Sequence, residues 1–405
     1  MTTLTTRRKT VAATAVLLLA TAGCGSPQPP RTTTVHREAP AGPAPGKEAP
    51  GPSSAGGAAA AERPFTLVAS GDILPHDSVN QRARADAGGH GYDFTKMLAG
   101  VRPVVSSADL AICHMETVYG PDGGPFTGYP AFKSPPQIAA ALRTTGYDSC
   151  STASNHTLDD GSAGLGRTLD ALDKAGVRHA GSARTEAEAA RPTLLRAGGA
   201  TVAHLAYTYG TNGFPLPEGE PWAVNLIDES RIVEDARAAR TAGADVVVVS
   251  LHWGTEWQTA LDDQQLTLGR GLTASATDGR PDIDLILGTH AHVPQAYEKV
   301  NGTWIVYGMG DQIAGDMINN LGARDPRGNQ GTLGRFTFAP PAVPGQRWEV
   351  RKAEFLPQWY NTATGRVINL NAAIERGEDH TEVRDVIRRA VLDRGAAEDG
   401  LLMGK

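Results

Sequence analysis

The sequence predicts an α/β fold in which mixed β-sheets form a sandwich with helices packed against it. From Phe65 onwards, short apolar runs typical of strands alternate with amphipathic helical patterns, as in parallel strands joined by helices. Towards the C-terminus, short turns separate the apolar runs and few helices intervene, as in antiparallel pairing. With 405 residues, 40% of them hydrophobic, the chain can build one large domain or two smaller ones.

The N-terminal segment has the pattern of a targeting signal. Basic residues at positions 7–9 precede an apolar run from Val11 to Ala20 that is too short to span a bilayer comfortably. Cys24 ends the segment "TAGC", which resembles the lipobox of bacterial lipoproteins, with Thr21 where Leu is usual. We expect residues 1–23 to be a lipoprotein signal peptide and Cys24 to be lipidated, which would anchor the protein on the outer face of the cell membrane. Ordinary secretion with cleavage elsewhere is the alternative.

The next segment differs sharply in composition. Residues 24–63 are rich in Pro, Ala, Gly, Ser and Thr without apolar periodicity, so we expect a disordered stalk, followed by a folded domain at 64–405. Loss of the signal segment, with its three positive charges, moves the formal net charge from −6 to −9. A net-negative surface disfavours nonspecific binding to nucleic acid or anionic lipid. We therefore expect no nucleic-acid partner, and membrane contact only through the lipid anchor.

Within the domain, apolar periodicity assigns the elements in order. "FTLVASG" and "DVVVVSLHWG" have the pattern of strands, whereas "GLGRTLDALDKAG" and "ESRIVEDARAARTAGA" have that of helices. Further helices are expected at residues 94–107, 135–145 and 381–393. "TWIVYGMG", "TLGRFTFAP" and "RWEVRKAEFLPQWY" are expected to pair antiparallel.

Two cysteines lie in the expected domain. Cys113 in "DLAICHME" and Cys150 in "YDSCSTAS" each occupy a short apolar run, where cysteine usually serves as a small buried hydrophobe. An extracellular location would permit a disulfide, but sequence does not establish proximity. We expect two free, buried thiols.

Polar residues follow several of the predicted strands. In open parallel sheets, ligands bind at the C-terminal ends of strands, so these residues should converge. Each alone could be a turn residue, a solvated charge or a satisfied core histidine. Together they offer oxygen and imidazole donors and need no thiolate. The set comprises Asp72 and His76, His114 and Glu116, Asn155 and His156, His252, and the pair His290 and His292.

That donor set suits two divalent metal ions, with Mn, Fe and Zn as candidates. Two ions about 3.5–4 Å apart can clamp a phosphoester and activate water near neutral pH. His290 and His292, one residue apart in "DLILGTHAHVPQAY", would then bind one ion each. The alternative is that both histidines lie at a polar edge of the fold and bind no metal.

The order of the motifs resembles that of the calcineurin-like metallophosphoesterases: "GD", an acidic residue after the second strand, "NH", a lone "H" and "GTHAH". "SGDILPH", "ADLAICHMETVYG", "SNHTLDDG", "SLHWGTEW", "GTHAHVPQ" and "IVYGMGD" are similar to the motifs of the bacterial capsule synthesis CapA family, also called the poly-gamma-glutamate biosynthesis family. The resemblance covers about residues 65–316 and implies a metallophosphoesterase-like four-layer α-β-β-α sandwich with mixed sheets.

The resemblance also implies roles for individual residues. His156 would act on the leaving group as a general acid or charge stabiliser, and His76 is a candidate further ligand. His114 stands where the family usually has Asn, so it would alter the metal preference or support a ligand from outside. Asp311 replaces the Asn of a usual "GN". The implied metal ligands are Asp72, Glu116, Asn155, His252, His290 and His292.

Other residues near these motifs have less defined roles. Lys133 could supply positive charge to an anionic substrate, although a solvated lysine is the default. Glu256, with Trp253 and Trp257 in "HWGTEW", could line a substrate wall or pack its loop.

Two functions are consistent with the sequence. One is a metal-dependent phosphoesterase-type hydrolase linked to capsule or cell-envelope polymer synthesis. The other is a non-catalytic accessory protein that binds and guides an anionic polymer such as poly-gamma-glutamate during export. Partners would be that polymer or a phosphoester substrate, and a membrane complex for capsule synthesis or export. The intact set of ligands favours the hydrolase, and a purely structural metal site is a third alternative.

Overall fold

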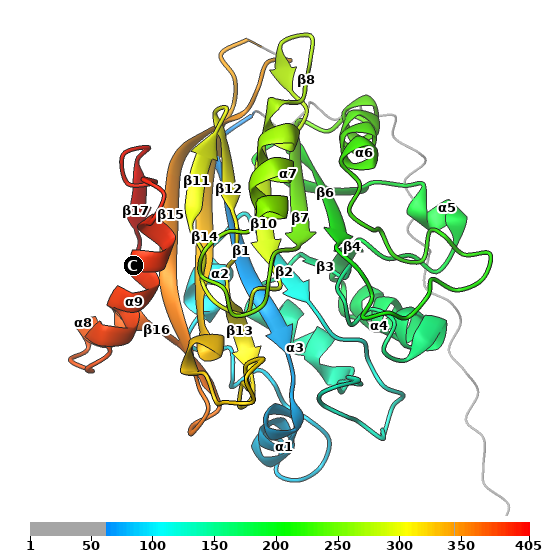
Figure 1. Ribbon diagram of the computed structural model, residues 1–405, viewed down its shortest axis with the longest axis vertical. Coiled ribbons are helices and arrows are strands. Elements are labelled where there is room, and N and C mark those ends of the chain that lie inside the picture. Colours follow the sequence, from blue (N-terminus) through cyan, green and yellow to red (C-terminus); the bar gives the residue numbers. More distant parts are fainter. Residues whose placement is uncertain (1–61, 344) are drawn as a thin grey trace, which may run out of the picture. The chain divides into compact units, whose positions relative to one another are not determined.

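The computed structural model describes residues 62–343 and 345–405, and its centre is a pair of facing β-sheets (Figure 1). The expected signal peptide, Cys24 and residues 25–61 of the expected stalk lie outside the described residues. Among the residues that are described, no helix is both long enough and apolar enough to cross a membrane.

The first sheet has the strand order β16-β15-β14-β1-β2-β3-β4, with β13 beside β1 and β17 beside β15. Strands β1 to β4 run parallel, whereas β14, β15 and β16 are antiparallel to their neighbours in that order. The strands are β1 (Phe65–Leu74), β2 (Leu110–Met115), β3 (Ser149–Ser151), β4 (Arg178–Ala180), β13 (Asp311–Ala314), β14 (Gln330–Ala339), β15 (Glu349–Asn361), β16 (Arg366–Asn369) and β17 (Leu401–Met403).

The second sheet has the order β11-β12-β10-β7-β6-β5. Its central strands β6, β7, β10 and β12 are parallel, and β5 and β11 close its edges antiparallel. The strands are β5 (Thr193–Ala197), β6 (Ala200–Thr208), β7 (Val246–His252), β10 (Leu285–Thr289), β11 (Tyr297–Val300) and β12 (Thr303–Val306), and a separate hairpin pairs β8 (Ala276–Thr277) with β9 (Arg280–Pro281).

Helices cover the outer faces of both sheets. On the second sheet, apolar residues of α6 and α7, including Ile232 and Leu272, pack against strand residues such as Val247 and Ile286. The helices are α1 (Asp77–Asp86), α2 (Arg102–Val105), α3 (Gln137–Thr145), α4 (Gly161–Ala175), α5 (Glu186–Ala189), α6 (Glu229–Thr241), α7 (Asp263–Ala274), α8 (Leu370–Glu375) and α9 (Thr381–Leu392), with a 3₁₀ helix η1 (Pro326–Asn329).

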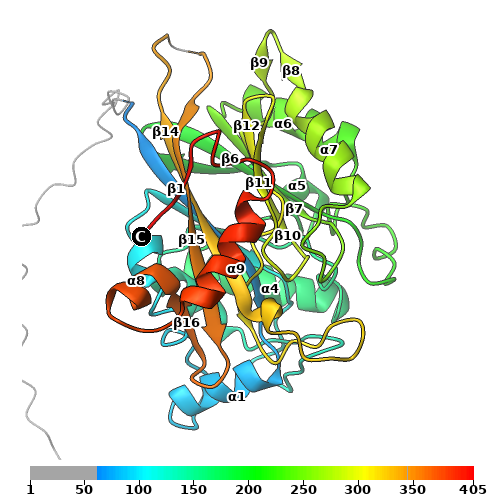
Figure 2. The same ribbon diagram turned by 60° about the vertical axis from the view of Figure 1, so that its left-hand side comes forward.

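The inner core lies between the two sheets. Leu67 and Ile112 of the first sheet pack with Val248 and Leu287 of the second, and all four are almost completely buried. A second core, containing Ile138 of α3, lies on the outer face of the first sheet. Helix, sheet, sheet and helix follow one another as layers, so the expected four-layer sandwich is confirmed. Figure 2 shows α9 packed across β14 and β15, and its buried Ile387 and Val391 belong to the inner core.

Local sequence signals set the helix ends. Asp262 caps α7, where its side chain accepts the N–H of Gln265 and the Gln265 side chain bonds back to the Asp262 backbone. Helices α3 and α4 end at Gly146 and Gly176, whose positive φ angles suit glycine. The helices expected at 135–145 and 381–393 are confirmed.

The helix expected at residues 94–107 is wrong. Only α2, at Arg102–Val105, is helical there, and turns precede it. Pro103 lies in the first turn of α2, where its missing N–H costs nothing, but it would break a longer helix that ran through it. The helix-like spacing of Phe94, Met97 and Val101 nevertheless serves burial, since all three are in the outer core.

The antiparallel pairing expected for the C-terminal strands is confirmed for β14 and β15 but wrong for one side of β12. This strand, which carries "TWIV", is antiparallel to β11 and parallel to β10. Asn301 and Gly302, both with positive φ, turn the chain back tightly after β11. After this turn, β12 pairs with β10 and runs in the same direction as β10.

The expectation of two free thiols is also wrong. A disulfide joins Cys113 and Cys150, whose Cα atoms are 4.4 Å apart. The two residues are direct partners in the register of the parallel strands β2 and β3. Only the register brings them together, because 37 residues separate them along the chain.

Candidate metal centre

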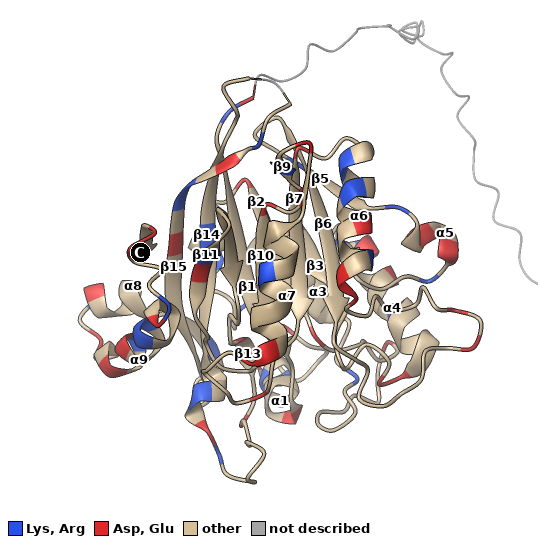
Figure 3. Ribbon diagram, turned by 45° about the horizontal axis from the view of Figure 1, so that its top comes forward, with Lys and Arg blue, Asp and Glu red and all other residues tan. Residues whose placement is uncertain are grey.

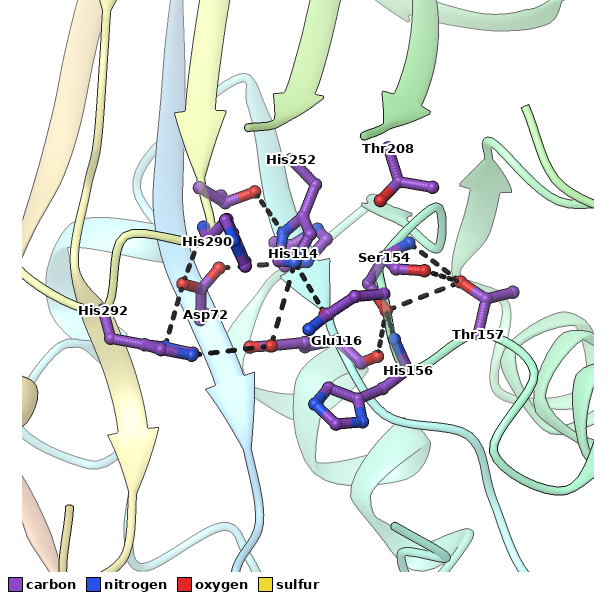
Figure 4. Close-up of polar contacts among 12 residues, drawn as sticks. Asp72, His114, Glu116, Ser154, His156, Thr157, Thr208, His252, His290 and His292 are labelled. Atoms are coloured by element: carbon purple, nitrogen blue, oxygen red, sulfur yellow. Dashed lines mark hydrogen bonds and ion pairs between the residues drawn. The ribbon is translucent and has the colours of Figure 1, made fainter. Parts of the chain in front are cut away.

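The convergence expected at the strand ends is present in the structure. Figure 4 shows side chains from β1, β2, β7 and the loops after β3 and β10 gathered in one place. Asp72 and His114 lie within β1 and β2 rather than after these strands as predicted, and they are register partners. His252 is the last residue of β7, opposite Thr289 at the end of β10.

Close backbone packing places Asp72 precisely. Gly71 precedes it, and a Cβ at that position would lie 1.7 Å from the carbonyl oxygen of Gly310. The Asp72 N–H donates to the same carbonyl at 3.0 Å. Only glycine permits this approach of β1 to the loop before β13, which carries Asp311 into the site.

Asp72 lies between two groups of candidate ligands. Its Oδ1 is 3.8 Å from His114 Nε2, and its Oδ2 is 3.7 Å from His292 Nδ1. One group is Asp72, His114 and His252, and the other is Asp72, Glu116 and His292; within each, one ligand atom per residue lies within 4.8 Å of the others. Asp72 is therefore common to both groups of candidate ligands.

Glu116 and Asn155 extend the two groups. Glu116 Oε1 is 3.8 Å from His252 Nε2 and 3.9 Å from His292 Nε2. Asn155 Oδ1 is 2.9 Å from His252 Nε2. An amide oxygen and an imidazole nitrogen this close together could both contribute to holding a divalent ion.

His290 lies beside the two ligand groups without belonging to either. Its N–H donates to Asp72 Oδ2 at 3.1 Å, and its ring centroid is 4.7 Å from that of His252. Tyr209 also packs against the His290 ring, with centroids 4.4 Å apart. The φ of +91° at His290 and of +57° at His292 is unusual for residues other than glycine and directs both side chains into the site.

Burial raises the pKa values of the carboxyl groups in the site and lowers those of several histidines. It raises the pKa of Asp72 well above its usual value, with the charge of Asp311 adding to the effect, and it likewise raises the pKa of Glu116. Burial lowers the pKa of His114 to about 3 and the pKa values of His252 and His290 well below the usual range. These imidazoles are therefore neutral, with lone pairs available for a cation.

His292 behaves differently from the other histidines. Burial alone would lower its pKa, but the carboxylates of Asp311 and Glu116 outweigh burial and raise the pKa well above the usual value. Asp311 Oδ1 lies 2.9 Å from His292 Nδ1, which leaves Nε2 facing Glu116. Asp311 thus orients a candidate ligand by a hydrogen bond, as carboxylates do around metal-bound histidines.

The buried polar atoms of the site fit a divalent cation. Several find no hydrogen-bond partner among the described residues, and unpaired buried groups of this kind are costly. A cation between them would satisfy the acceptors and relieve the repulsion of the carboxylates. These atoms are Asp72 Oδ1, His114 Nε2, Glu116 Oε1 and Oε2, His290 Nδ1 and Asp311 Oδ2.

His156 lies beside these groups without joining them, as Figure 4 shows. Its Nδ1 is 2.7 Å from Asp159 Oδ2, and Phe132 packs edge-on at 4.8 Å between centroids. The Phe132 N–H donates to the same Asp159 oxygen at 2.7 Å. Asp159 was not among the predicted site residues, although its position three residues after His156 in the turn "NHTLDD" was the available signal.

Ser154 is a second residue of the site that was not predicted from the sequence. Its hydroxyl donates to the carbonyl oxygen of Glu116 at 2.5 Å and accepts the N–H of His156 at 3.0 Å. It therefore holds the candidate ligand and the candidate acid in a fixed relation.

The remaining expected residues lie at the periphery. His76 Nδ1 accepts the N–H of Gly315 at 3.1 Å, burial lowers the pKa of His76 to about 4, and it belongs to neither ligand group. Lys133 Nζ is 3.7 Å from Asp160 Oδ1, so its charge already has a partner. Glu256 is half-buried and close enough to contribute to the raised pKa values of Glu116 and Asp311.

Residues 66–316, more than half of the chain, match the family model described as bacterial capsule synthesis protein PGA_cap. The chain belongs to this family. It is 28% identical over 174 residues to the PGA biosynthesis protein CapA of Bacillus subtilis, covering 42% of this chain and 44% of that protein. It is 27% identical over 253 residues to a probable polyglutamine synthesis accessory protein of Mycobacterium tuberculosis, covering 58% and 63%. The matches thus span less than two thirds of either relative.

Solved structures are similar to this chain at lower identity. A putative 5′-nucleotidase from Staphylococcus aureus is 15% identical with a TM-score of 0.46, covering 80% of this chain and 58% of that one. A calcineurin-like phosphoesterase from Bacillus subtilis is 14% identical with a TM-score of 0.43, covering 81% and 100%.

Proposed function

We propose that this member of the capsule synthesis family is a metal-dependent hydrolase of phosphoester-type bonds that uses two divalent ions. The observation that carries the proposal is that buried Asp72 belongs to both ligand groups, in which Asp72 Oδ1, His114 Nε2 and both Glu116 carboxylate oxygens lack hydrogen-bond partners among the described residues. A site that served only to hold the fold together would not require two adjacent groups sharing one carboxylate. Mn, Fe and Zn all suit the mixture of carboxylate and imidazole donors.

The residues that would hold the ions are Asp72, His114, Glu116, His252 and His292. Divalent ions bound there would supply Lewis-acid polarisation of the phosphoryl group and activation of water. Asp311 would hold the ring of His292 through Nδ1 so that Nε2 faces inward.

His156 would move the proton to the leaving group. Its Nδ1–H donates to Asp159, so Nε2 is the ring position that can give a proton to the departing oxygen. Asp159 would stabilise the charged imidazole and fix its orientation, as a buried carboxylate does for a catalytic histidine. Phe132, packed on the His156 ring, would keep water away from it.

The accessory role in polymer export is the second candidate. It is favoured by the mycobacterial relative, which is described as a probable accessory protein of polyglutamine synthesis. An extended polyanion would need a continuous basic surface. Figure 3 shows instead that basic and acidic residues are mixed along α6 and α9, and Lys133 near the site is paired with Asp160.

The expected lipid anchor at Cys24 would place this activity on the outer face of the membrane, beside a complex for capsule synthesis or export. The substrate would then be a phosphoester of an envelope polymer or its precursor.

One experiment separates the two candidate functions. The full-length protein is stripped with a chelator, reloaded with Mn, Fe or Zn, and assayed for metal content and for hydrolysis of a panel of phosphomonoesters and phosphodiesters. Hydrolysis with about two ions bound per chain is the expected result. Full metal loading without turnover on any substrate would favour the accessory role, and failure to bind any of the three metals would exclude the hydrolase.

A further inference from the structure

A cavity of about 310 Å³ lies between α1, the loop after β13 and the hairpin that joins β15 to β16, and the proposed reaction does not use it. Figure 2 shows α1 next to that hairpin. Strands β1 and β13 run side by side from the metal centre, where Asp72 and Asp311 are register partners, towards this cavity.

Groups that donate hydrogen bonds dominate the lining of the cavity. Two guanidinium groups and three hydroxyl groups lie there with one carboxylate, and these side chains belong to Ser78, Arg82, Asp316, Arg324, Tyr360 and Thr362. Asp316 pairs with Arg324 at 2.7 Å, but both side chains are 59% exposed, and exposed ion pairs contribute little. The lining therefore suits an anion, which both guanidinium groups can bind.

Arg82 has a charge that its neighbours only partly neutralise. Its Nε is buried, lies 3.5 Å from Asp86 Oδ1 and forms no hydrogen bond with the described residues. Asp86 instead accepts two hydrogen bonds from Arg366, at 2.8 and 2.9 Å. One carboxylate thus serves two guanidinium groups, which leaves positive charge beside the cavity. A Cβ at Gly365 would lie 2.5 Å from Arg82 Cγ, so glycine lets the hairpin pack closely on the Arg82 stem.

Tyr360 adds a buried donor to the cavity. The residue is 2% exposed, lines the cavity and forms no hydrogen bond through its hydroxyl with the other described residues. Burial raises the pKa of Tyr360 to about 12, so the hydroxyl keeps its proton. The Thr362 hydroxyl accepts from Arg324 Nη2 at 3.1 Å, which leaves its own proton available to a ligand. An anion in the cavity would satisfy both hydroxyls.

The cavity is close enough to the metal centre to bind another part of the same molecule. Asp316 follows Asp311 by five residues, so at about 3.3 Å per residue the two lie within about 17 Å of each other. His76, at the periphery of the metal centre, accepts the N–H of Gly315, the residue before Asp316. A single cavity binds one anionic group at a time and does not require the continuous basic surface expected for polymer export.

We propose that this cavity is a subsite for a second anionic group, a phosphate or a carboxylate, of the substrate whose phosphoester lies at the metal centre. The substrate class is then an elongated phosphoester that carries anionic groups at intervals, and Arg82 and Tyr360 are the residues that select it. This inference rests on the proposed hydrolase function and deepens it by naming the class of substrate.

The first test measures binding without turnover. Full-length protein, freed of divalent metal by dialysis, is titrated at low ionic strength with inorganic phosphate and with acetate by calorimetry. We expect about one ion bound per chain, with affinity at least about tenfold weaker in Arg82→Gln and severalfold weaker in Tyr360→Phe, which removes only the hydroxyl. Arg84→Gln is the matched control and should bind as the wild type does, because Arg84 is an exposed arginine of the same helix.

The comparison of the two ions identifies the group that the cavity prefers, since the tighter of them names it as phosphate or carboxylate. No binding of either ion would overturn the subsite. Unchanged affinity in both Arg82→Gln and Tyr360→Phe, with normal folding by circular dichroism, would also overturn it.

The second test connects the cavity with the reaction. Metal-loaded full-length protein is assayed on α,ω-alkanediol bisphosphates of increasing length, each beside the alkyl monophosphate of the same length. We expect the KM of the bisphosphate to be about tenfold lower over one range of lengths, because its second phosphate reaches the cavity. Arg82→Gln should raise that KM to the value for the monophosphate, whereas Arg84→Gln should leave both values unchanged.

The two tests separate the failure of the subsite from the failure of the hydrolase. Equal KM values for bisphosphate and monophosphate at every length would overturn the second-group assignment while the hydrolase stands. Absence of turnover on every substrate would remove the hydrolase, and the calorimetric titration of the metal-free chain would still decide whether the cavity binds an anion.

Discussion

Replacement of His156 by alanine tests whether this residue donates a proton to the leaving group. The side chain is 6% exposed, its Nδ1 is committed to Asp159 at 2.7 Å, and Phe132 packs against the ring. Only Nε2 is then available for proton transfer. A positioned general acid contributes about 10²–10⁴-fold, so His156→Ala should reduce kcat by at least about a hundredfold on an alkyl phosphoester.

The loss should depend on the leaving group. A p-nitrophenolate departs without a proton, so the same variant should lose less than about tenfold on a p-nitrophenyl phosphoester. Asp159→Asn keeps an oxygen acceptor for Nδ1–H but removes the negative charge, and we expect an intermediate loss of about tenfold on the alkyl ester. Metal content should remain at the wild-type level in both variants, because His156 lies outside both ligand groups.

The assay compares kcat on the two ester types at saturating metal, with His90→Ala as the control at an exposed histidine. Equal losses of His156→Ala on both esters would refute proton donation and indicate a role in binding. A fall in metal content would show instead that His156 supports a ligand.

Further predictions concern anchoring, the disulfide and the approach of β1 to its neighbouring loop. Cys24→Ala should move the protein from the membrane fraction to the soluble fraction, and retention in the membrane would contradict the lipid anchor. Serine at both Cys113 and Cys150 should lower the free energy of unfolding by about 3–4 kcal/mol, given the 37-residue separation; urea unfolding measures this, and an unchanged value would argue against the disulfide. Gly71→Ala should cost about 1–3 kcal/mol or more and reduce bound metal, because its Cβ would meet the Gly310 carbonyl oxygen at 1.7 Å. Wild-type stability and metal content in this variant would refute that close approach.

The sequence by itself predicted a mixed-sheet α/β sandwich, its resemblance to the family implied the four layers, and the two together selected most of the residues that meet in the site. Alternation of apolar strands with amphipathic helices implies parallel strands, and parallel strands deliver their ends to one edge of a sheet. That local logic, with the family motifs, was enough to select residues such as Asp72, Glu116 and His252 before any distance was known. The glycine at the end of "GLGRTLDALDKAG" likewise located the end of α4.

Only the tertiary structure decided the pairings between strands. The register of β2 places His114 beside Asp72 on one side and Cys113 beside Cys150 on the other. A shift by one residue would turn each side chain to the opposite face, and no local sequence pattern sets such a register.

The direction of β12 and the contact of Asp159 with His156 were also undetermined by the sequence. The first depends on a tight turn that folds β12 back beside β10, and the second on the geometry of one loop. In both cases apolar periodicity reports which face of an element is buried, whereas the neighbour of a given side chain depends on how distant segments pack together.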